Sequence, residues 1–305
     1  MSVKILFLST SSNETTKYAE SLGCLNPESV AIIRYDDENY VDSLVIAKAK
    51  EYAPDFIVYI GSRWGAQITI LTLAKLNTEI APTVHICSDA ADPPWHDLLM
   101  EYHYAGAFAL QVAIDGNKQW PLHGTSAGMT ALTPVDPSRF NGFKPHSDRS
   151  IACGYAGNPG SDGSVRRHIL SELVFHHAID VRLRAEGPDS YGKMCAYMQD
   201  CRISINLSHT GTQAAKQVKG RVVEAALAGS CLLELAGSPT CDWFSLNADF
   251  LQYEGPGDAI ETIKHYSTRP EETEAMGRRL REKVLAEHTP LKFWSKICER
   301  IGVKT

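Results

Sequence analysis

Two basic residues and one glutamate lie close together in the sequence, in a pattern suited to binding a phosphorylated ligand. Lys219 and Arg221 flank Gly220 where a helix is expected to begin. A helix N-terminus presents free N–H groups and the positive end of its dipole, so it attracts anions. Glu224 follows and could accept hydrogen bonds from two ribose hydroxyls. An ordinary amphipathic helix with a solvated basic start fits this stretch equally well.

A second glycine-rich, basic turn precedes another expected helix. Gly157 and Asn158 lie in its loop, after an apolar run, and Arg166 and Arg167 lie in the first turn of the helix. A strand, a glycine-rich loop and a basic helix start also form an anion-binding arrangement. The alternative is a surface helix with two exposed arginines. Two such turns in one half of the chain favour a diphosphate site.

Short apolar runs alternate with helix-like stretches along the chain. This alternation predicts parallel sheets with helices on both faces. The expected strands are 4–9, 30–35, 56–60, 83–87, 109–114, 151–156, 178–184, 202–207, 231–235 and 249–253. Prolines and a glycine interrupt residues 134–150, so a linker is expected there. The sequence therefore predicts an α/β protein with two domains.

Composition narrows the class of protein. The 305 residues suffice for two domains, and 44% hydrophobic with 22% charged residues is typical of a soluble globular protein. A net charge of −6 argues against a protein that mainly grips nucleic-acid backbone. No apolar run approaches the ~20 residues of a membrane span, and the first residues read as a strand, not a signal peptide. We expect a cytoplasmic protein.

Metal and dinucleotide sites are not expected. The eight cysteines include no Cys-x-x-Cys pair, and the eleven histidines include no His-x-x-x-His with an acidic partner. This pattern predicts reduced, buried thiols and no metal site. The turn after the first expected strand, residues 9–13, is Ser-Thr-Ser-Ser-Asn and lacks the glycines of a NAD or FAD site. No cofactor is therefore expected.

Residues 219–234 resemble the nucleotide-sugar signature of GT-B glycosyltransferases. They read Lys-Gly-Arg-Val-Val-Glu-Ala-Ala-Leu-Ala-Gly-Ser-Cys-Leu-Leu-Glu and are similar to the spore-maturation (CgeB-type) group of family-1-like glycosyl transferases. The resemblance implies two Rossmann-like domains facing a cleft. These would span residues 1–140, the acceptor side, and 150–289, the donor side. The C-terminal helix 290–303 would pack back on the first domain.

The same resemblance implies roles in donor binding. Basic residues would face the diphosphate, and Glu224 would hold the ribose. Fixed cations would stabilise the charge that grows on the leaving phosphate, in place of a divalent metal. The implied donor-binding residues are Gly157, Asn158, Arg166, Arg167, Asn206, Lys219, Gly220, Arg221 and Glu224. Lys216 departs from the pattern, because many retaining GT-B enzymes have a glutamate there.

Residues 88–97 of the first half resemble the Asp-Asp-Pro-Trp region of the same family. Asp89 would orient or deprotonate an acceptor hydroxyl, and Arg221 is the second residue expected to act in catalysis. A cluster of helix-capping aspartates is the alternative. The residues expected on the acceptor side are Ser11, Arg63, Trp95 and His96. The first-domain Gly-Gly loop of the family is missing.

The implied function is sugar transfer from a nucleotide-diphosphate donor, such as a UDP-sugar, to an acceptor hydroxyl. By analogy the reaction would retain the anomeric configuration and need no metal. The acceptor could be a polymer, a small molecule, a protein or a modified nucleic-acid base. One alternative is a nucleotide-sugar epimerase or hydrolase on the same fold. The other is a catalytically degenerate protein that binds a sugar nucleotide without turnover.

Overall fold

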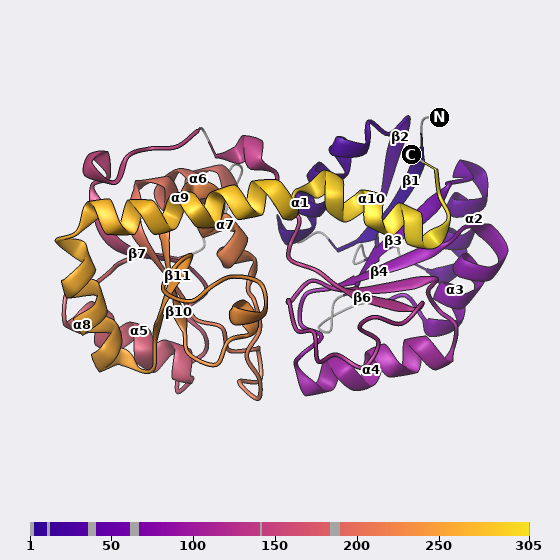
Figure 1. Ribbon diagram of the computed structural model, residues 1–305. Helices are drawn as coiled ribbons and strands as arrows, with labels where there is room; N and C mark the ends of the chain where they lie inside the picture. Colours follow the sequence, from indigo (N-terminus) through magenta and orange to yellow (C-terminus); the bar gives the residue numbers. More distant parts are fainter. Residues whose placement is uncertain are drawn as a thin grey trace. The chain divides into compact units, whose positions relative to one another are not determined.

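The computed structural model describes residues 3–10, 13–35, 41–61, 67–140, 142–183 and 190–304. The chain forms two compact units (Figure 1). The first contains Met1–Asp136 and Thr289–Thr305, and the second contains Pro137–His288. Each unit is a parallel sheet with helices on both faces. The chain is therefore an α/β protein with two Rossmann-like units, as the alternation of elements predicts.

The first sheet has six strands, all of them parallel to their neighbours. Their order across the sheet is β2 (Ser29–Arg34), β1 (Lys4–Ser9), β3 (Phe56–Ile60), β4 (Thr83–Cys87), β5 (Leu110–Ala113) and β6 (Gly128–Thr130). The apolar runs predict the first five in the chain. They do not predict β6, because three residues are too short to show an alternating pattern.

Two groups of helices cover the faces of this sheet. One face packs on α2 (Asp42–Tyr52), α3 (Ile70–Lys75), a π-turn (Leu76–Ile80) and α4 (Pro93–Tyr104). The other packs on α1 (Asn13–Ser21), a 3₁₀ turn (Leu22–Leu25) and α10 (Pro290–Ile301).

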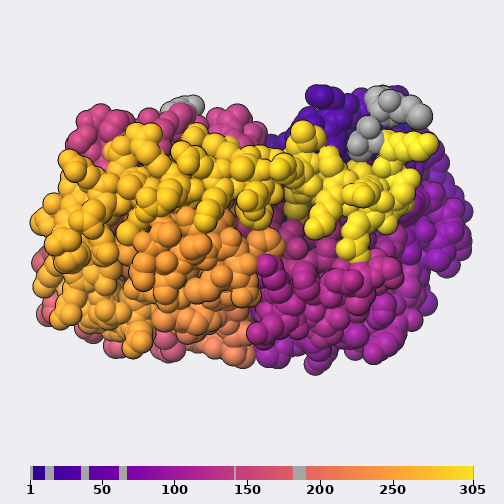
Figure 2. Space-filling view, viewed as in Figure 1, coloured from indigo at the N-terminus to yellow at the C-terminus, as the bar shows by residue number. Residues whose placement is uncertain are grey.

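The C-terminal helix α10 belongs to the first unit. Its apolar side carries Phe293, Trp294 and Ile297, which are buried among residues of the first sheet. The indole Nε1 of Trp294 donates a hydrogen bond to Ser21 Oγ at 2.9 Å. Figure 2 shows the yellow atoms of this helix lying on the first unit. The last residues of the chain thus complete the core built by the first.

The second sheet has five parallel strands. Their order is β8 (Asp180–Leu183), β7 (Ile151–Gly157), β9 (Cys201–Asn206), β10 (Cys231–Leu235) and β11 (Phe250–Tyr253). On one face lie α6 (Ser190–Asp200), α7 (Gly220–Ala228) and α9 (Pro270–Glu287) (Figure 1). On the other lie α5 (Val165–Phe175) and α8 (Pro256–Ser267). Short 3₁₀ turns occupy Pro137–Arg139, His146–Asp148 and Pro239–Asp242.

In both sheets the strand order reverses at one point. The chain adds β2 on one side of β1 and then β3 on the other, and it treats β7, β8 and β9 in the same way. Ligands of open α/β sheets bind at such a reversal, outside the carboxyl ends of the strands. In the second unit this place lies between the ends of β7 and β9. Ser11 and Arg63, which the sequence analysis predicts on the acceptor side, lie outside the described residues.

Candidate anion-binding site

The N-terminus of α7 is available for a ligand. Lys219 is its N-cap residue, in an extended conformation, and no side chain caps the helix there. The first turn contains no acidic residue, and the residues from Val222 to Ala228 are buried. Gly229 ends the helix with a positive φ of 69°. The helix is thus held rigidly, and its positive end lies near the carboxyl end of β9.

Glu224 is fixed from two sides on the buried face of α7. Its side chain is 2% exposed, and Oε1 accepts a hydrogen bond from the Tyr191 hydroxyl at 3.1 Å. Its Oε2 lies 3.6 Å from Nη1 of Arg221, one turn earlier. Tyr191 lies in the first turn of α6 and is not among the predicted site residues. A cation and a phenol therefore hold the carboxylate predicted to bind ribose.

Arg221 lies directly against the end of β7. A Cβ atom added to Gly157 would come within 2.4 Å of Arg221 Nη2, and Gly157 has a φ of 153° that disfavours other residues. Burial raises the pKa of Tyr155, and the charges of Arg221 and Arg166 oppose this rise. Both arginines therefore lie near Tyr155. The Nε of Arg221 is buried without a hydrogen-bond partner among the described residues. A buried donor of this kind is expected to meet a ligand acceptor.

Arg166 reaches the same place from α5. Its Nη2 donates to the backbone oxygen of His209 at 2.7 Å, just beyond β9. Within the described chain, Arg166 Nε and His209 Nδ1 are further buried atoms without a hydrogen-bond partner. Burial lowers the pKa of His209, and the charges of Lys216, Arg166 and Lys219 lower it further. These cations therefore surround the imidazole closely enough to influence its protonation.

Arg167 is directed elsewhere, although it is the next residue. Its Nε lies 3.3 Å from Asp162 Oδ1, and both side chains are well exposed. Ser164 caps α5, accepting a hydrogen bond from the backbone N–H of Arg167 at 3.2 Å. The structure thus brings Arg166 into the cluster and leaves Arg167 outside it.

The loop between β9 and α7 is a compact turn tied to its surroundings. Gln213 Oε1 accepts a hydrogen bond from the backbone N–H of Val165, in the first turn of α5, at 2.6 Å. The backbone N–H of Gln217 donates to the oxygen of Ser208 at 3.0 Å. Lys216 donates to the backbone oxygen of Ala236, just beyond β10. At the position where many retaining GT-B enzymes have a glutamate, this chain has a further cation, and its charge acts on His209.

Glu234 is a buried carboxylate beneath the cluster. It accepts hydrogen bonds from Asn206 Nδ2 at 2.8 Å, Thr240 Oγ1 at 3.2 Å and the backbone N–H of Leu235 at 3.0 Å. Burial raises its pKa to about 7. The amide of Asn206, itself 2% exposed, is thus engaged inside the protein, and its direct contact with a donor stays a prediction. In the sequence, Glu234 stands out only as a charged residue within the apolar run 231–235.

The predicted residues of the first unit lie at and beyond the end of β4. Asp89 accepts a backbone hydrogen bond from Asp92 through its own backbone oxygen at 2.9 Å. Trp95 is 8% exposed and packs from α4 into the core of the first unit. His96, the next residue, is half-exposed beside Asp97. Their acceptor-side roles, and the catalytic role of Asp89, stay predictions.

Asp115 organises this loop. Its carboxylate accepts hydrogen bonds from the backbone N–H groups of Ala91 at 2.7 Å and Asn117 at 3.2 Å. Burial raises its pKa to about 6. The sequence indicates a turn at this position but gives no sign that the aspartate binds the neighbouring loop.

The described part of the chain contains no group of three His, Cys, Asp or Glu side chains that could hold a metal ion. In the same residues, no helix is long and apolar enough to cross a membrane. All eight cysteines are free, and they are buried apart from the half-buried Cys24 and the exposed Cys241.

Comparisons with known proteins concern the family and the fold. Residues 163–299 match the model of a family described as glycosyl transferase-like. A comparison with curated proteins finds no match. The family match includes α5, α7 and the loop between β9 and α7, and it supports the resemblance to glycosyltransferases. It does not test the spore-maturation subgroup.

Solved structures show the fold. HepE of Anabaena, in complex with UDP-glucose, has a TM-score of 0.70 at 12% identity, over 98% of this chain and 99% of that chain. Sucrose-phosphate synthase of Thermosynechococcus elongatus has a TM-score of 0.65 at 10% identity, over 98% and 97%. AviGT4, a glycosyltransferase of avilamycin A biosynthesis, gives 0.62 at 9%, over 98% and 97%. The chain thus has the GT-B fold of two Rossmann-like domains.

Proposed function

We propose that this protein is a glycosyltransferase whose donor is a nucleoside-diphosphate sugar, with UDP-sugars the first class to test. The observation that carries the proposal is a set of buried N atoms on Arg166, His209 and Arg221 that have no hydrogen-bond partner among the described residues. They lie at the reversal point of a sheet, where such folds bind ligands. HepE, which has this fold, was solved with UDP-glucose bound.

In this proposal Arg166, Lys219 and Arg221 bind the diphosphate together with the N–H groups at the start of α7. Glu224 accepts hydrogen bonds from the ribose, and Gly157 leaves room for Arg221 beside the phosphates. Negative charge grows on the β-phosphate as the glycosidic bond breaks. Fixed cations aimed at that phosphate stabilise the transition state more than the ground state. The reaction therefore needs neither a metal nor another cofactor.

The remaining assignments of the proposal concern the acceptor. Asp89 orients or deprotonates the acceptor hydroxyl, and His96 lies half-exposed nearby in the chain. By analogy with retaining GT-B enzymes, the transfer retains the anomeric configuration. These assignments follow from family likeness, so they need tests separate from the donor site.

The test of the donor site is a thermal-shift series with UDP-, GDP-, ADP-, CMP- and dTDP-sugars in the presence of EDTA. A hundredfold excess over Kd stabilises the protein by about 2.7 kcal/mol. We expect one nucleotide class to raise the unfolding temperature. Arg166→Ala should abolish that rise, and Arg167→Ala, its matched neighbour, should keep it. Equal losses in both variants, or no rise with any nucleotide, would contradict the site.

Product analysis separates transfer from the two alternatives. The protein is incubated with the nucleotide sugar that binds, with and without a panel of hydroxyl acceptors. Sugar found on an acceptor supports the transferase. Free sugar or an epimer without acceptor indicates a hydrolase or epimerase, and binding without any product indicates the degenerate protein.

A further inference from the structure

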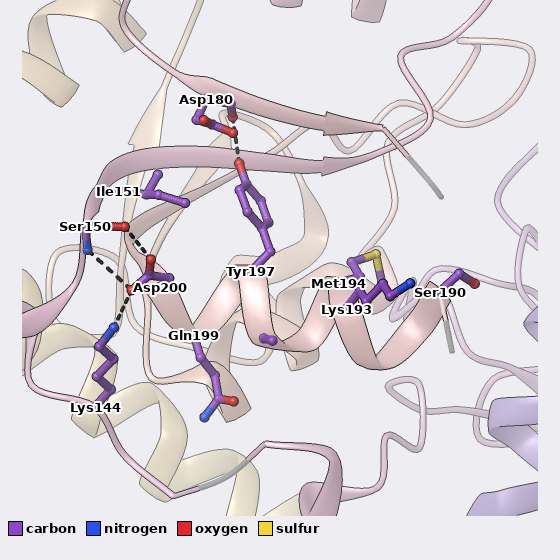
Figure 3. Close-up of a pocket in the computed structure, with 11 residues that line it drawn as sticks. Lys144, Ser150, Ile151, Asp180, Ser190, Lys193, Met194, Tyr197, Gln199 and Asp200 are labelled. Atoms are coloured by element: carbon purple, nitrogen blue, oxygen red, sulfur yellow. Dashed lines mark hydrogen bonds and ion pairs between the residues drawn. The ribbon is translucent and has the colours of Figure 1, made fainter. Parts of the chain in front are cut away.

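A second candidate site is a pocket that runs along α6, from Asp200 at the amino end of the sheet to Ser190 at the start of the helix (Figure 3). Its volume is about 840 Å³, within the ~300–1,000 Å³ typical of small-molecule sites. Ser150 and Ile151 line it where β7 begins, and Asp180 lines it where β8 begins. The anion-binding cluster lies beyond the other end of β7, roughly 20 Å from the end of the pocket formed by Ser150 and Ile151. Ser190 precedes Tyr191, which donates to Glu224, but none of the residues assigned to the donor site lines the pocket.

One wall of the pocket is a closed polar network. Asp200, the last residue of α6, accepts hydrogen bonds from Lys144 Nζ and from the hydroxyl of Ser150, drawn as dashed lines in Figure 3. The backbone N–H of Ser150 adds a third at 3.3 Å. The hydrogen bonds from Lys144 and Ser150 lower the pKa of Asp200 to about 2. This carboxylate is therefore ionised and already neutralised by its lysine.

The aromatic ring of Tyr197 forms another wall. It projects from α6 towards β8, and its hydroxyl donates to the backbone oxygen of Asp180 at 2.8 Å (Figure 3). A Cβ atom on Gly154 would lie 2.5 Å from that hydroxyl, so the glycine lets the ring approach β7. Met194 and Ile151 add apolar surface beside it. The pocket thus has a partly apolar lining.

The charges of the lining identify the class of ligand. Two lysines, Lys144 and Lys193, are matched by two aspartates, Asp180 and Asp200. Lys193 is exposed and has no hydrogen-bond or ion-pair partner among the described residues. A phosphate would need an excess of cations, and a lipid tail would need a lining without charge. Mixed donors and acceptors beside an aromatic ring suit hydroxyl groups attached to an apolar C–H face.

We propose that this pocket binds a neutral oligosaccharide, independently of a nucleotide bound at the anion-binding site. The sugar hydroxyls donate to the carboxylate of Asp180 and accept from Lys193. The C–H face of a pyranose packs on Tyr197 and Met194. The proposal does not depend on sugar transfer, because it rests on the pocket alone.

The test uses the full chain with ¹³C-methyl methionine. Met194 lines the pocket, and Met276, buried in the same unit, is the internal reference. Maltotriose and cellotriose are titrated into the millimolar range, with and without saturating UDP. We expect a saturable shift of the Met194 methyl signal with at least one trisaccharide, no shift of Met276, and the same Kd when UDP is present.

Two variants and a control localise the binding. Ala196 lines the pocket and is exposed, so Ala196→Trp should fill the pocket and abolish the Met194 shift without disturbing the core. Lys193→Ala should weaken binding about fivefold through one lost hydrogen bond. Lys264→Ala, an exposed lysine on α8, should change nothing.

Three results would overturn the proposal. These are no Met194 shift with either trisaccharide, a shift that survives Ala196→Trp, and competition with UDP, which would place the sugar at the donor site. Failure of the donor site itself would be seen separately, as absence of UDP binding. The two proposals can therefore fail independently.

Discussion

The two ends of the second sheet use similar residues for opposite purposes. At the carboxyl end, Arg166 and Arg221 each retain a buried N atom without a partner in the described chain. At the amino end, Lys144 and Asp200 neutralise each other, and Ser150 completes the hydrogen bonds of the carboxylate. The difference teaches that the number of cations does not define an anion site. An anion site is defined by buried hydrogen-bond donors that have no partner within the protein itself.

The carboxylates at the two ends differ in the same sense. Glu234 is fully buried, and desolvation raises its pKa to about 7. Asp200 lies beside a lysine, and its pKa falls to about 2. Glu234 is therefore partly protonated near neutral pH, whereas Asp200 is ionised and paired with Lys144. Four variants break or sharpen this contrast.

The largest effect is expected from Arg221→Ala. The change removes a cation from the anion site and leaves the buried Glu224 without its ion pair. Truncating one partner of a buried charge pair costs about 2–5 kcal/mol, so UDP affinity should fall more than about 100-fold. Isothermal titration calorimetry with UDP measures the loss. Arg269→Ala, an exposed arginine paired with Glu272, is the control and should bind normally.

Glu234→Gln should change how stability depends on pH. The folded-state pKa of about 7 lies above the ordinary 4.5, so the folded protein holds a proton that the unfolded chain releases. This contribution is complete below about pH 4.5 and is lost as pH rises through about 7. The wild type should therefore lose up to about 3 kcal/mol more than the variant between pH 4.5 and 8.

Urea unfolding at a series of pH values measures the free energy of unfolding for both proteins. Asp115 also has a raised pKa, so the quantity compared is the difference between wild type and variant. Parallel pH profiles for the two proteins would show that Glu234 does not hold a proton in the folded state.

Gly157→Ala should have an intermediate effect. The new methyl group would meet the guanidinium of Arg221 at 2.4 Å and displace it. We expect UDP affinity to fall about tenfold, or about 1.4 kcal/mol. Gly163→Ala is the matched control, because Gly163 also has a positive φ, of 76°, but no atom lies within 4 Å of its added Cβ. An equal loss in the control would attribute the effect to backbone strain, not to Arg221.

The smallest effect is expected from Asp200→Asn. Its folded pKa is depressed, so the stability that the carboxylate adds is present above its ordinary pKa, near 4, and is lost as pH falls towards 2. The wild type should therefore lose its advantage over the variant in acid, the reverse of the Glu234 comparison. The free energy of unfolding at pH 6 and pH 3 measures this. If the difference in free energy of unfolding between wild type and variant did not change with pH, the depressed pKa of Asp200 would be contradicted.

The sequence was a good guide to the elements and to part of the site. Apolar runs located ten of the eleven strands, because buried parallel strands are continuously apolar. The group Lys219, Arg221 and Glu224 was visible because its members lie within two turns of one helix. Sequence could not choose between Arg166 and Arg167, since the choice depends on how α5 is rotated against the loop after β9.

Contacts between distant segments were not predictable. Tyr191 meets Glu224 across 33 positions of sequence, and only the packing of α6 on α7 brings them together. The second pocket has the same origin, because Lys144 and Asp200 are 56 positions apart. Neither pairing leaves a periodic pattern, so neither has a signal in a single sequence.

The position of α10 has a consequence for the order of folding during synthesis. The second unit is one continuous stretch, Pro137–His288, so its whole sequence leaves the ribosome before Thr289 does. The first unit, although it begins the chain, still lacks Phe293, Trp294 and Ile297 from its core at that moment. Domains fold as units during synthesis. The N-terminal unit is therefore expected to finish last, when the final helix of the chain becomes available.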